Sequence, residues 1–370
     1  MSKLFSEITI GQLKLENRIV VPPMCQYSAV NGQASEWHLM HYGNLALSGA
    51  GLLIFEATGV APEGRISFAD LGLWDDKTAF ALKKVVDFIH LHSPIHLGIQ
   101  LSHAGRKAST DLGWKPDRYI APDAPNGWQT FAPSAEPLTA GGTIPKELSR
   151  NEIKAIVRQF AQAAKRAVDI GFNLVELHAA HGYLMHQFLS PITNKRKDEY
   201  GGSLENRMRF VLEIFDAVKS VTPKDFPVCI RISATDWIEG GWDLGQSIEL
   251  AKQLEERGCG YIHVSTGGVD GGLQKMPAIH SGYQLSFAEA IKKEVTMPVI
   301  GVGLITKPQE AEDVINEGKA DLIALGRGML YDPRWGWHAA AELGAKVAGV
   351  KQYARCKPHE VKVLFNEANI

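Results

Sequence analysis

The chain has 370 residues, of which 45% are hydrophobic and 22% charged, and its formal net charge is −2. This composition is typical of a globular protein, and the nearly balanced charge gives no reason to expect nucleic acid or an anionic membrane as a partner. The first ten residues lack the apolar segment of a signal peptide, and no stretch approaches the ~18 apolar residues of a membrane span. We therefore expect a cytoplasmic protein.

The four cysteines, Cys25, Cys229, Cys259 and Cys356, are scattered and form no C-x-x-C pair. Structural zinc sites, iron–sulfur clusters and disulfide frameworks all require characteristic cysteine spacings. This spacing argues against all three, and we predict no bound metal and a reducing compartment.

One pattern recurs along the chain: a short β-branched run, then polar or glycine-rich residues, then a helical period. The strand-like runs are residues 18–21, 51–56, 95–101, 174–178, 228–233, 261–265, 298–302 and 321–325. They are almost continuously apolar, as expected for parallel strands covered by helices outside and packed inside a barrel. Eight such runs with interleaved helices predict an α/β protein, a (β/α)₈ TIM barrel in which residues 1–370 form one domain.

Helix boundaries support this pattern. Ser149 and Glu152 have the spacing of a capping box before a segment with apolar residues at helical intervals. Glycines follow several helical segments directly before a strand, at Gly49, Gly171, Gly258 and Gly318. Glycine suits the left-handed position that ends a helix, so short loops are expected there.

Two segments interrupt the alternation. Residues 110–145 are rich in proline, glycine, aspartate and tryptophan, and we interpret them as a capping excursion after the third strand. Residues 193–205 are polar and form a second long loop after the fourth strand. In a barrel both loops lie at the carboxyl end of the strands, where active sites are built.

The fourth strand ends with His178, His181 and Tyr183. Two histidines can polarise one substrate oxygen, and a tyrosine, a weak acid with a pKa of about 10, can protonate a basic carbanion. Alternatively these are loop groups satisfied by the backbone, or part of a metal site, although no nearby Asp, Glu or Cys completes a ligand set. Their position at a strand end favours catalysis.

Glycines follow the seventh and eighth strands, Gly303 in the first case and Gly326 before Arg327 in the second. Barrels commonly bind phosphate on these two loops through backbone N–H groups, and an arginine can pair with the charge. The alternative is that the glycines serve only as turns. We predict a cofactor or substrate that carries phosphate.

Polar residues within apolar strands raise a further question. Arg231 lies inside the fifth strand, where an unpaired cation is costly, so it either pairs with a barrel carboxylate or faces an anionic ligand. Glu56 is one candidate partner for it. Gln100, in the third strand, poses the same question.

Taken together, the motifs resemble those of the Old Yellow Enzyme family of FMN-dependent ene-reductases, in its bacterial branch of xenobiotic-reductase and thermophilic-type enzymes. The similarity extends almost from end to end. It rests on NRIVVPPMCQY (17–27), EATGVAPEGR (56–65), QLSHAGRK (100–107), HAAHGYL (178–184), NKRKDEYGGS (194–203) and the pair at 326–327. The resemblance implies a tightly but non-covalently bound FMN that NADPH or NADH reduces.

The resemblance also assigns residues to the cofactor. Gln100, Ala57 and Arg231 are expected at the pyrimidine edge of the flavin, and Gly303, Gly326 and Arg327 at its phosphate. Pro23, Met24 and Cys25 are expected to contact the flavin as well.

For the reaction, the resemblance implies that His178 and His181 bind the carbonyl or nitro oxygen of an α,β-unsaturated substrate. Hydride passes from flavin N5 to the β-carbon in a ping-pong cycle, and Tyr183 protonates the α-carbon. Cys25 and Tyr27 are expected to line the substrate site.

In thermophilic-type relatives the C-terminal residues lend an arginine to a neighbouring subunit. Arg355, in the tail formed by residues 346–370, fits the start of that pattern, although the tail then departs from it. A homo-oligomer, a dimer or tetramer, is the corresponding expectation.

Other function classes predict different residues. A barrel aldolase or isomerase needs a Schiff-base lysine in an apolar setting at a strand end, and no strand offers one. An iron–sulfur reductase of the dienoyl-CoA type needs a cysteine cluster and further domains. A flavin-binding or phosphate-binding sensor needs no His178–His181–Tyr183 trio, so the trio favours an enzyme.

Overall fold

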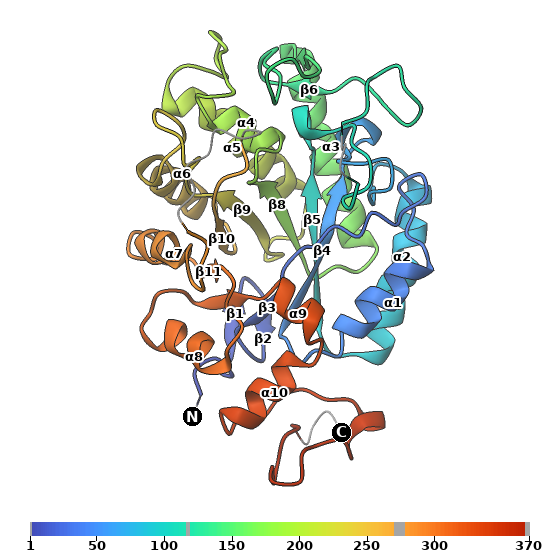
Figure 1. Ribbon diagram of the computed structural model, residues 1–370, viewed down its shortest axis with the longest axis vertical. Helices are drawn as coiled ribbons and strands as arrows, with labels where there is room; N and C mark the ends of the chain where they lie inside the picture. Colours follow the sequence, from blue (N-terminus) through green and yellow to red (C-terminus); the bar gives the residue numbers. More distant parts are fainter. Residues whose placement is uncertain (1, 116–118, 270–277, 367–370) are drawn as a thin grey trace.

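A closed barrel of eight parallel strands forms the centre of the protein (Figure 1). The computed structural model describes residues 2–115, 119–269 and 278–366. The barrel strands are β3 (Ile19–Val21), β4 (Leu52–Gly59), β5 (His96–Ser102), β8 (Leu174–Ala179), β9 (Val228–Ser233), β10 (Ile262–Ser265), β11 (Val299–Val302) and β12 (Leu322–Ala324). Because β12 pairs with β3, the sheet closes on itself, and the predicted (β/α)₈ barrel is confirmed.

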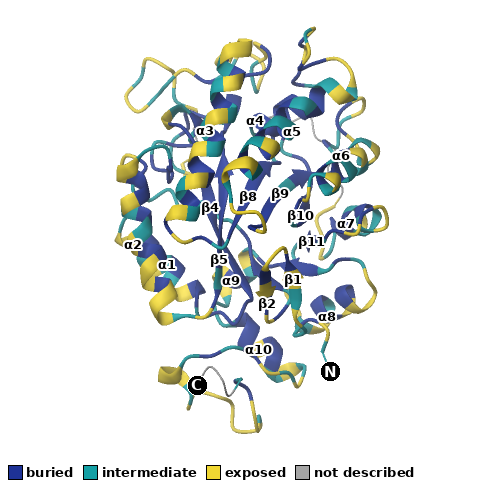
Figure 2. Ribbon diagram, turned by 180° about the vertical axis from the view of Figure 1, so that it is seen from behind, coloured by how far each residue is buried: buried dark blue, intermediate teal, exposed yellow. Residues whose placement is uncertain are grey.

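Helices surround the barrel and turn their buried faces towards the strands (Figure 2). They are α1 (Glu36–Leu45), α2 (Asp76–His92), α3 (Arg150–Asp169), α4 (Leu184–Leu189), α5 (Leu204–Val221), α6 (Leu244–Glu256), α7 (Leu285–Lys292), α8 (Pro308–Asn316), α9 (Arg327–Tyr331) and α10 (Trp335–Glu342). Within the described residues, no helix is long and apolar enough to cross a membrane.

The side chains inside the barrel change character along the strands. Near the amino ends of the strands they form an apolar cluster that includes Leu174 of β8 and Tyr261 beside β10. Because successive residues of a strand point to opposite faces, the next inward positions towards the carboxyl ends are Glu176 and His263. The interior is therefore apolar at one end and polar at the other, which positions the polar groups for a site.

The amino end of the barrel is covered by a hairpin that the sequence pattern did not predict. Strands β1 (Ile8–Ile10) and β2 (Leu13–Leu15) pair antiparallel, and their apolar side chains join the cluster inside the barrel. Each strand has only three residues, too short for a periodic signal to stand out.

Both predicted long loops lie after the third and fourth barrel strands. The excursion after β5 contains the short parallel pair β6 (Phe131–Ala132) and β7 (Lys146–Glu147), and its residues 116–118 lie outside the described part. The segment after β8 holds α4, a helix that the sequence analysis did not predict, before the loop that leads to α5. Figure 1 shows these segments at the end to which the strand arrows point.

The predicted helix boundaries are confirmed. Ser149 and Glu152 form a capping box at the start of α3, with the N–H of Ser149 donating to Oε2 of Glu152 at 2.8 Å. The backbone φ angles of the four predicted helix-ending glycines are all positive, between 71° and 103°. Left-handed backbone of this kind favours glycine because it has no Cβ.

Two of these glycines provide a matched test of stability. A Cβ on Gly49 would lie 2.6 Å from Cδ1 of Trp337 and 2.8 Å from Cγ2 of Val347, whereas a Cβ on Gly318 would meet nothing within 4 Å. We expect Gly318→Ala to lower the free energy of unfolding by about 1–2 kcal/mol through its backbone conformation alone. Gly49→Ala should cost about 1–3 kcal/mol more, because the core is overpacked. Calorimetric unfolding of both variants checks this, and equal losses would contradict it.

Candidate active site

The residues predicted for chemistry on the fourth barrel strand meet at its carboxyl end. The ring centroids of His178 and Tyr183 are 4.7 Å apart, and those of His178 and His181 are 5.3 Å apart. His178 is buried, whereas His181 and Tyr183 are partly exposed. The structure therefore brings the trio together at the end of the barrel where ligands bind.

Hydrogen bonds orient both imidazole rings. Nδ1 of His178 accepts the backbone N–H of Ala180 at 3.3 Å, so the proton of the neutral ring is on Nε2. Nε2 of His181 lies 2.8 Å from Oγ of Ser265. Burial, followed by the charge of Arg231, lowers the pKa of both histidines well below the usual 6.5. Both rings are therefore neutral at pH 7, and each keeps one nitrogen free of bonds to the described residues.

The loop that carries His181 is held in a fixed, left-handed conformation. The φ angles of His181 and Gly182 are +57° and +74°. The backbone N–H of Gly182 donates to Nδ1 of His186 at 2.8 Å, and Nε2 of His186 contacts Oδ1 of Asp236 at 2.8 Å. Nζ of Lys107 donates to the carbonyl of His181 at 2.8 Å. These contacts fix the position of His181 at the carboxyl end of β8.

No role was predicted from the sequence for His186, Asp236 or Lys107. A signal was available for Asp236, a carboxylate shortly after the carboxyl end of a barrel strand, but its partner His186 is 50 residues away. Lys107 stands within the motif at 100–107, where only Gln100 was assigned a role. The chain brings these residues together only through the barrel topology.

Arg231 lies on β9 between the neighbours His178 on β8 and His263 on β10. Its Nε is buried and has no hydrogen-bond partner within the described part of the chain. Burial lowers the pKa of Arg231, and the charge of Glu176 opposes this effect. The guanidinium is therefore close to a carboxylate, yet it keeps a donor for a ligand.

The suggestion that Glu56 pairs with Arg231 is wrong. The register of β4 against β5 shifts between Phe55 and Ala57, so Glu56 is the extra residue of a bulge. A bulge re-aims side chains, and this carboxylate accepts hydrogen bonds from the hydroxyl of Tyr42 at 3.0 Å and the N–H of Gln26 at 3.0 Å. Glu56 thus secures the loop after β3, not the arginine.

The same bulge aligns two of the residues expected at the flavin. After the shift, Ala57 of β4 stands opposite Gln100 of β5. Ala57 also belongs to a small apolar cluster against which Cys25 and Tyr183 pack. Residues from two barrel strands, from the loop after β8 and from the loop after β3 therefore converge.

The loop after β3 presents its predicted side chains partly exposed at this end of the barrel. Pro23, Met24, Cys25 and Tyr27 are all of intermediate exposure. Tyr27 has a φ of +50°, and its ring makes an edge contact with Trp114 of the excursion, with centroids 6.0 Å apart. Cys25 is partly exposed, and it packs against the same small apolar cluster as Tyr183.

The three residues predicted for phosphate lie after β11 and β12. Gly303 has a φ of +143°, and Gly326 caps the short helix α9, whose first residue is Arg327. Arg327 is exposed, and a Cβ on Gly326 would approach Sδ of Met24 at 3.6 Å. The loop after β12 and the loop after β3 therefore adjoin.

Arg355 is not brought to the other predicted residues within this chain. It is exposed and follows the turn η3 (Lys351–Tyr353), in a tail that lies at the other end of the barrel (Figure 1). Residues 367–370 of the tail lie outside the described part. Arg355 therefore lies away from the site of its own chain, and its role at a neighbouring subunit stays a prediction.

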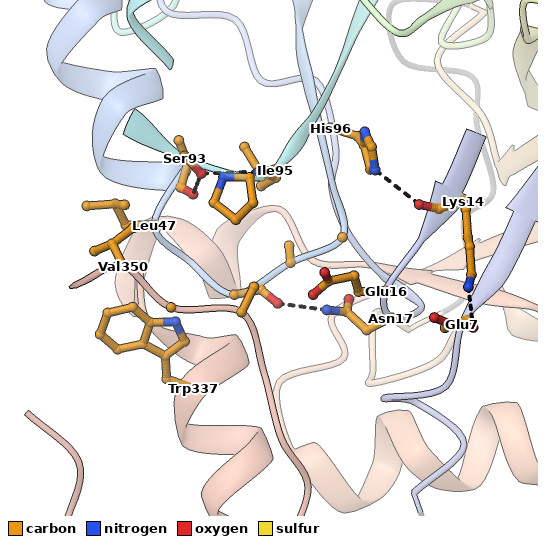
Figure 3. A pocket seen from close by; sticks show the side chains of 17 residues that line it. Glu7, Lys14, Glu16, Asn17, Leu47, Ser93, Ile95, His96, Trp337 and Val350 are labelled. Carbon is orange, nitrogen blue, oxygen red and sulfur yellow. Dashed lines mark hydrogen bonds and ion pairs between the residues drawn. The ribbon is translucent and has the colours of Figure 1, made fainter. Parts of the chain in front are cut away.

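A cavity of about 270 Å³ lies at the amino end of the strands, opposite the site (Figure 3). Its lining includes Gly51 and His96 at the starts of β4 and β5, together with Trp337 of α10. Across its rim Lys14 pairs with Glu7 at 2.8 Å. None of the residues predicted for function lines this cavity.

The observed groups fit the flavin that the sequence analysis predicted. Arg231 has a buried, unpartnered Nε, and Gln100 donates its amide nitrogen to Glu176, which leaves its oxygen for a ligand. The first N–H groups of α9 have no partner inside the helix, and Arg327 stands beside them. Among the described residues, no group of three or more His, Cys, Asp or Glu side chains is arranged to hold a metal.

The chain is similar to known proteins over most of its length. Residues 3–345 match the NADH:flavin oxidoreductase / NADH oxidase family. The chain is 44% identical over 357 residues to an NADPH dehydrogenase of Listeria monocytogenes serotype 4a (strain HCC23), covering 96% of this chain and 99% of the relative. An NADPH dehydrogenase of Geobacillus thermodenitrificans (strain NG80-2) is 43% identical over 357 residues, covering 95% and 98%.

Solved structures agree with this match. Morphinone reductase in complex with tetrahydroNAD superimposes with a TM-score of 0.74 at 29% identity, covering 98% of each chain. A 2-naphthoyl-CoA reductase in complex with 2-naphthoyl-CoA has a TM-score of 0.82 at 26% identity, and the match covers 93% of this chain and 52% of that one.

Proposed function

The chain belongs to the NADH:flavin oxidoreductase / NADH oxidase family, that of Old Yellow Enzyme, and from this premise we propose that it reduces the activated C=C bonds of α,β-unsaturated carbonyl or nitro compounds. As a member of this family it is an FMN-dependent oxidoreductase that takes its electrons from NADPH or NADH. The bound flavin supplies the hydride chemistry.

One observation carries the substrate proposal: two neutral histidines and a tyrosine stand edge to face at the carboxyl end of β8. Nε2–H of His178 is the donor proposed to bind the oxygen of the substrate, and His181 is proposed to donate from Nδ1 in the tautomer whose Nε2 accepts from Oγ of Ser265. Such donors draw electron density away from the β-carbon and stabilise the negative charge that develops on the oxygen. A neutral imidazole donates without surrendering its proton, which suits a polarising role.

Tyr183 is the proposed proton donor. Its ring packs against His178, and Nζ of Lys107 lies 5.3 Å from the ring centroid. A phenol that has lost its proton is stabilised by a nearby cation, so this placement assists proton transfer to the α-carbon. Cys25 and Tyr27 would line the substrate site from the loop after β3.

The cofactor would be held from two sides. Gln100, Ala57 and Arg231 would bind the pyrimidine edge of the flavin ring, and the cation of Arg231 would stabilise the negative charge that reduction adds. Gly303, Gly326 and Arg327 would hold the phosphate. Pro23 and Met24 would border the ring from the loop after β3.

We further propose a cytoplasmic homo-oligomer, a dimer or tetramer, in which Arg355 reaches the substrate site of a neighbouring subunit. The tail is on the opposite side of the barrel from that site, which supports action between subunits rather than within one (Figure 1).

The substrate proposal is tested by product analysis. The holoenzyme, with NADPH and 2-cyclohexenone under anaerobic conditions, is expected to form cyclohexanone in a 1:1 ratio to NADPH consumed. Cyclohexene is the matched control, because it has the C=C bond without the activating carbonyl. NADPH oxidation without cyclohexanone, or equal turnover of cyclohexene, would contradict the proposal.

The low pKa values of His178 and His181 give a pH prediction. Because both pKa values lie well below 6.5, protonation begins only at acidic pH, and the rings stay neutral between pH 6 and 8. The Kd of 2-cyclohexenone for the oxidised enzyme should therefore vary less than about twofold across that range. Spectral titration measures this Kd, and a tenfold change centred near pH 6.5 would show that a histidine titrates there.

A further inference from the structure

A buried carboxylate that the proposed mechanism does not use lies on β8 two residues before His178, towards the amino end of the strand. Glu176 of β8 is fully buried. Its Oε1 accepts from Nε2 of Gln100 at 2.7 Å. Its Oε2 accepts from the hydroxyl of Tyr261 at 2.9 Å and contacts Nδ1 of His263 at 3.0 Å. One donor from β5 and two from β10 and the residue before it thus point at one carboxylate inside the barrel.

The carboxylate is ionised at neutral pH. Burial by itself would raise its pKa, but the hydrogen bond from His263, the charge of Arg231 and the hydrogen bond from Tyr261 together hold that pKa below its usual value. Burial, followed by Arg231, lowers the pKa of His263, so that ring is neutral and donates through Nδ1. The network therefore contains one fixed negative charge.

The negative charge fixes the orientation of the Gln100 amide. A carboxylate accepts but cannot donate, so the NH₂ end of Gln100 must face Glu176. The carbonyl oxygen of the amide is then the end available to a ligand, where it can accept an N–H. A flipped amide would set two oxygens against each other.

The same charge acts on Arg231 without occupying its donors. None of the three hydrogen bonds of Glu176 to described residues involves Arg231, whose Nε keeps no partner within that part of the chain. Nevertheless the two charges interact across neighbouring strands. Glu176 thus offsets part of the positive field of Arg231 while leaving its N–H groups free.

We propose that Glu176 is a positioning residue that presents the oxygen of Gln100 to the flavin and, through its charge beside Arg231, lowers the reduction potential of the bound flavin. This inference rests on the proposed placement of the flavin beside Gln100 and Arg231. Glu176 would then be a residue beneath the site that helps to set the reduction potential of the flavin.

The test is the midpoint potential of bound FMN, measured anaerobically against a reference dye. Glu176→Gln removes the charge but keeps the shape, and we expect the reduction equilibrium to shift about tenfold towards reduced flavin, or about +30 mV for two electrons. Tyr261→Phe is the matched control, because it removes one bond to the same carboxylate and leaves both charges. We expect less than a threefold shift in this control.

A rise in potential for Glu176→Gln alone supports the inference. No rise, a fall, or an equal shift in Tyr261→Phe overturns it. If the single variant does not fold, the pair Glu176→Gln with Arg231→Met removes both buried charges. Its potential should then lie above that of Arg231→Met alone, and equal potentials would overturn the inference. A wild-type protein that binds no FMN would instead refute the proposed function, so the two failures are distinguishable.

Discussion

Tyr183→Phe is expected to slow the reoxidation of reduced enzyme by 2-cyclohexenone by about 10²–10⁴-fold, the usual contribution of a positioned general acid. The phenol hydroxyl is lost, but the ring that packs against His178 at 4.7 Å remains, so the substrate site keeps its shape. Reduction by NADPH requires no proton from Tyr183 and should change less than about twofold, which is small beside a general-acid effect. Stopped-flow absorbance at the flavin band measures both half-reactions separately.

Ferricyanide provides the control for this variant, because it accepts electrons without taking a proton from the protein. Reoxidation by ferricyanide should therefore be the same in Tyr183→Phe and wild type. If both half-reactions slow equally, or if ferricyanide and the enone are affected alike, Tyr183 is not the proton donor.

His178→Ala should lower the rate of enone reduction by about 10²–10³-fold, as is typical when a donor to a developing oxyanion is removed. It should also weaken the binding of phenols by about 1.5–3 kcal/mol, because one charge-assisted hydrogen bond is lost. The reason is geometric: Nδ1 of His178 is held by the N–H of Ala180, so Nε2–H is the group left for a ligand. Stopped-flow rates and phenol titrations measure the two effects.

A histidine outside the site supplies the matched control. His90 is exposed on α2, and its side chain forms a hydrogen bond with the carbonyl of Gly171 at 2.9 Å. His90→Ala should leave both the enone rate and phenol affinity unchanged. Unaltered phenol affinity in His178→Ala would remove His178 from the oxygen-binding site.

The barrel could be predicted from the sequence because each strand carries its own local signal. The eight apolar runs, the capping box at Ser149 and the glycines such as Gly171 depend on neighbouring residues only, and the structure confirms them. The position of His178 and its neighbours at a strand end likewise indicated a catalytic role for them. Local sequence pattern was sufficient to predict these features. In a barrel the carboxyl ends of all strands lie on one face, so a polar residue at a strand end is also near the other strand ends.

The remaining features depend on contacts that local pattern does not encode. Glu56 was assigned to the wrong partner because a bulge turns its side chain towards α1. The sequence contains no signal that predicts this bulge. Glu176 contacts Gln100 and His263, which are 76 and 87 residues distant. Predicting such a network requires the strand order and the register together.

The arrangement of the barrel explains why these buried groups bear on function. The interior is apolar at the amino end of the strands and polar at the carboxyl end, so charged side chains such as Glu176 and Arg231 lie just beneath the predicted flavin site. Charges in such a low-dielectric position act more strongly than they would in water.

The most direct test of the account is the anaerobic visible absorption spectrum of the purified protein, recorded first alone, then with NADPH, and then with 2-cyclohexenone. We expect a yellow protein whose flavin band bleaches with NADPH and returns in full when the enone is added. A protein that stays colourless after FMN is supplied would contradict the cofactor assignment. A bleached protein that the enone fails to restore would contradict the proposed reduction of activated C=C bonds.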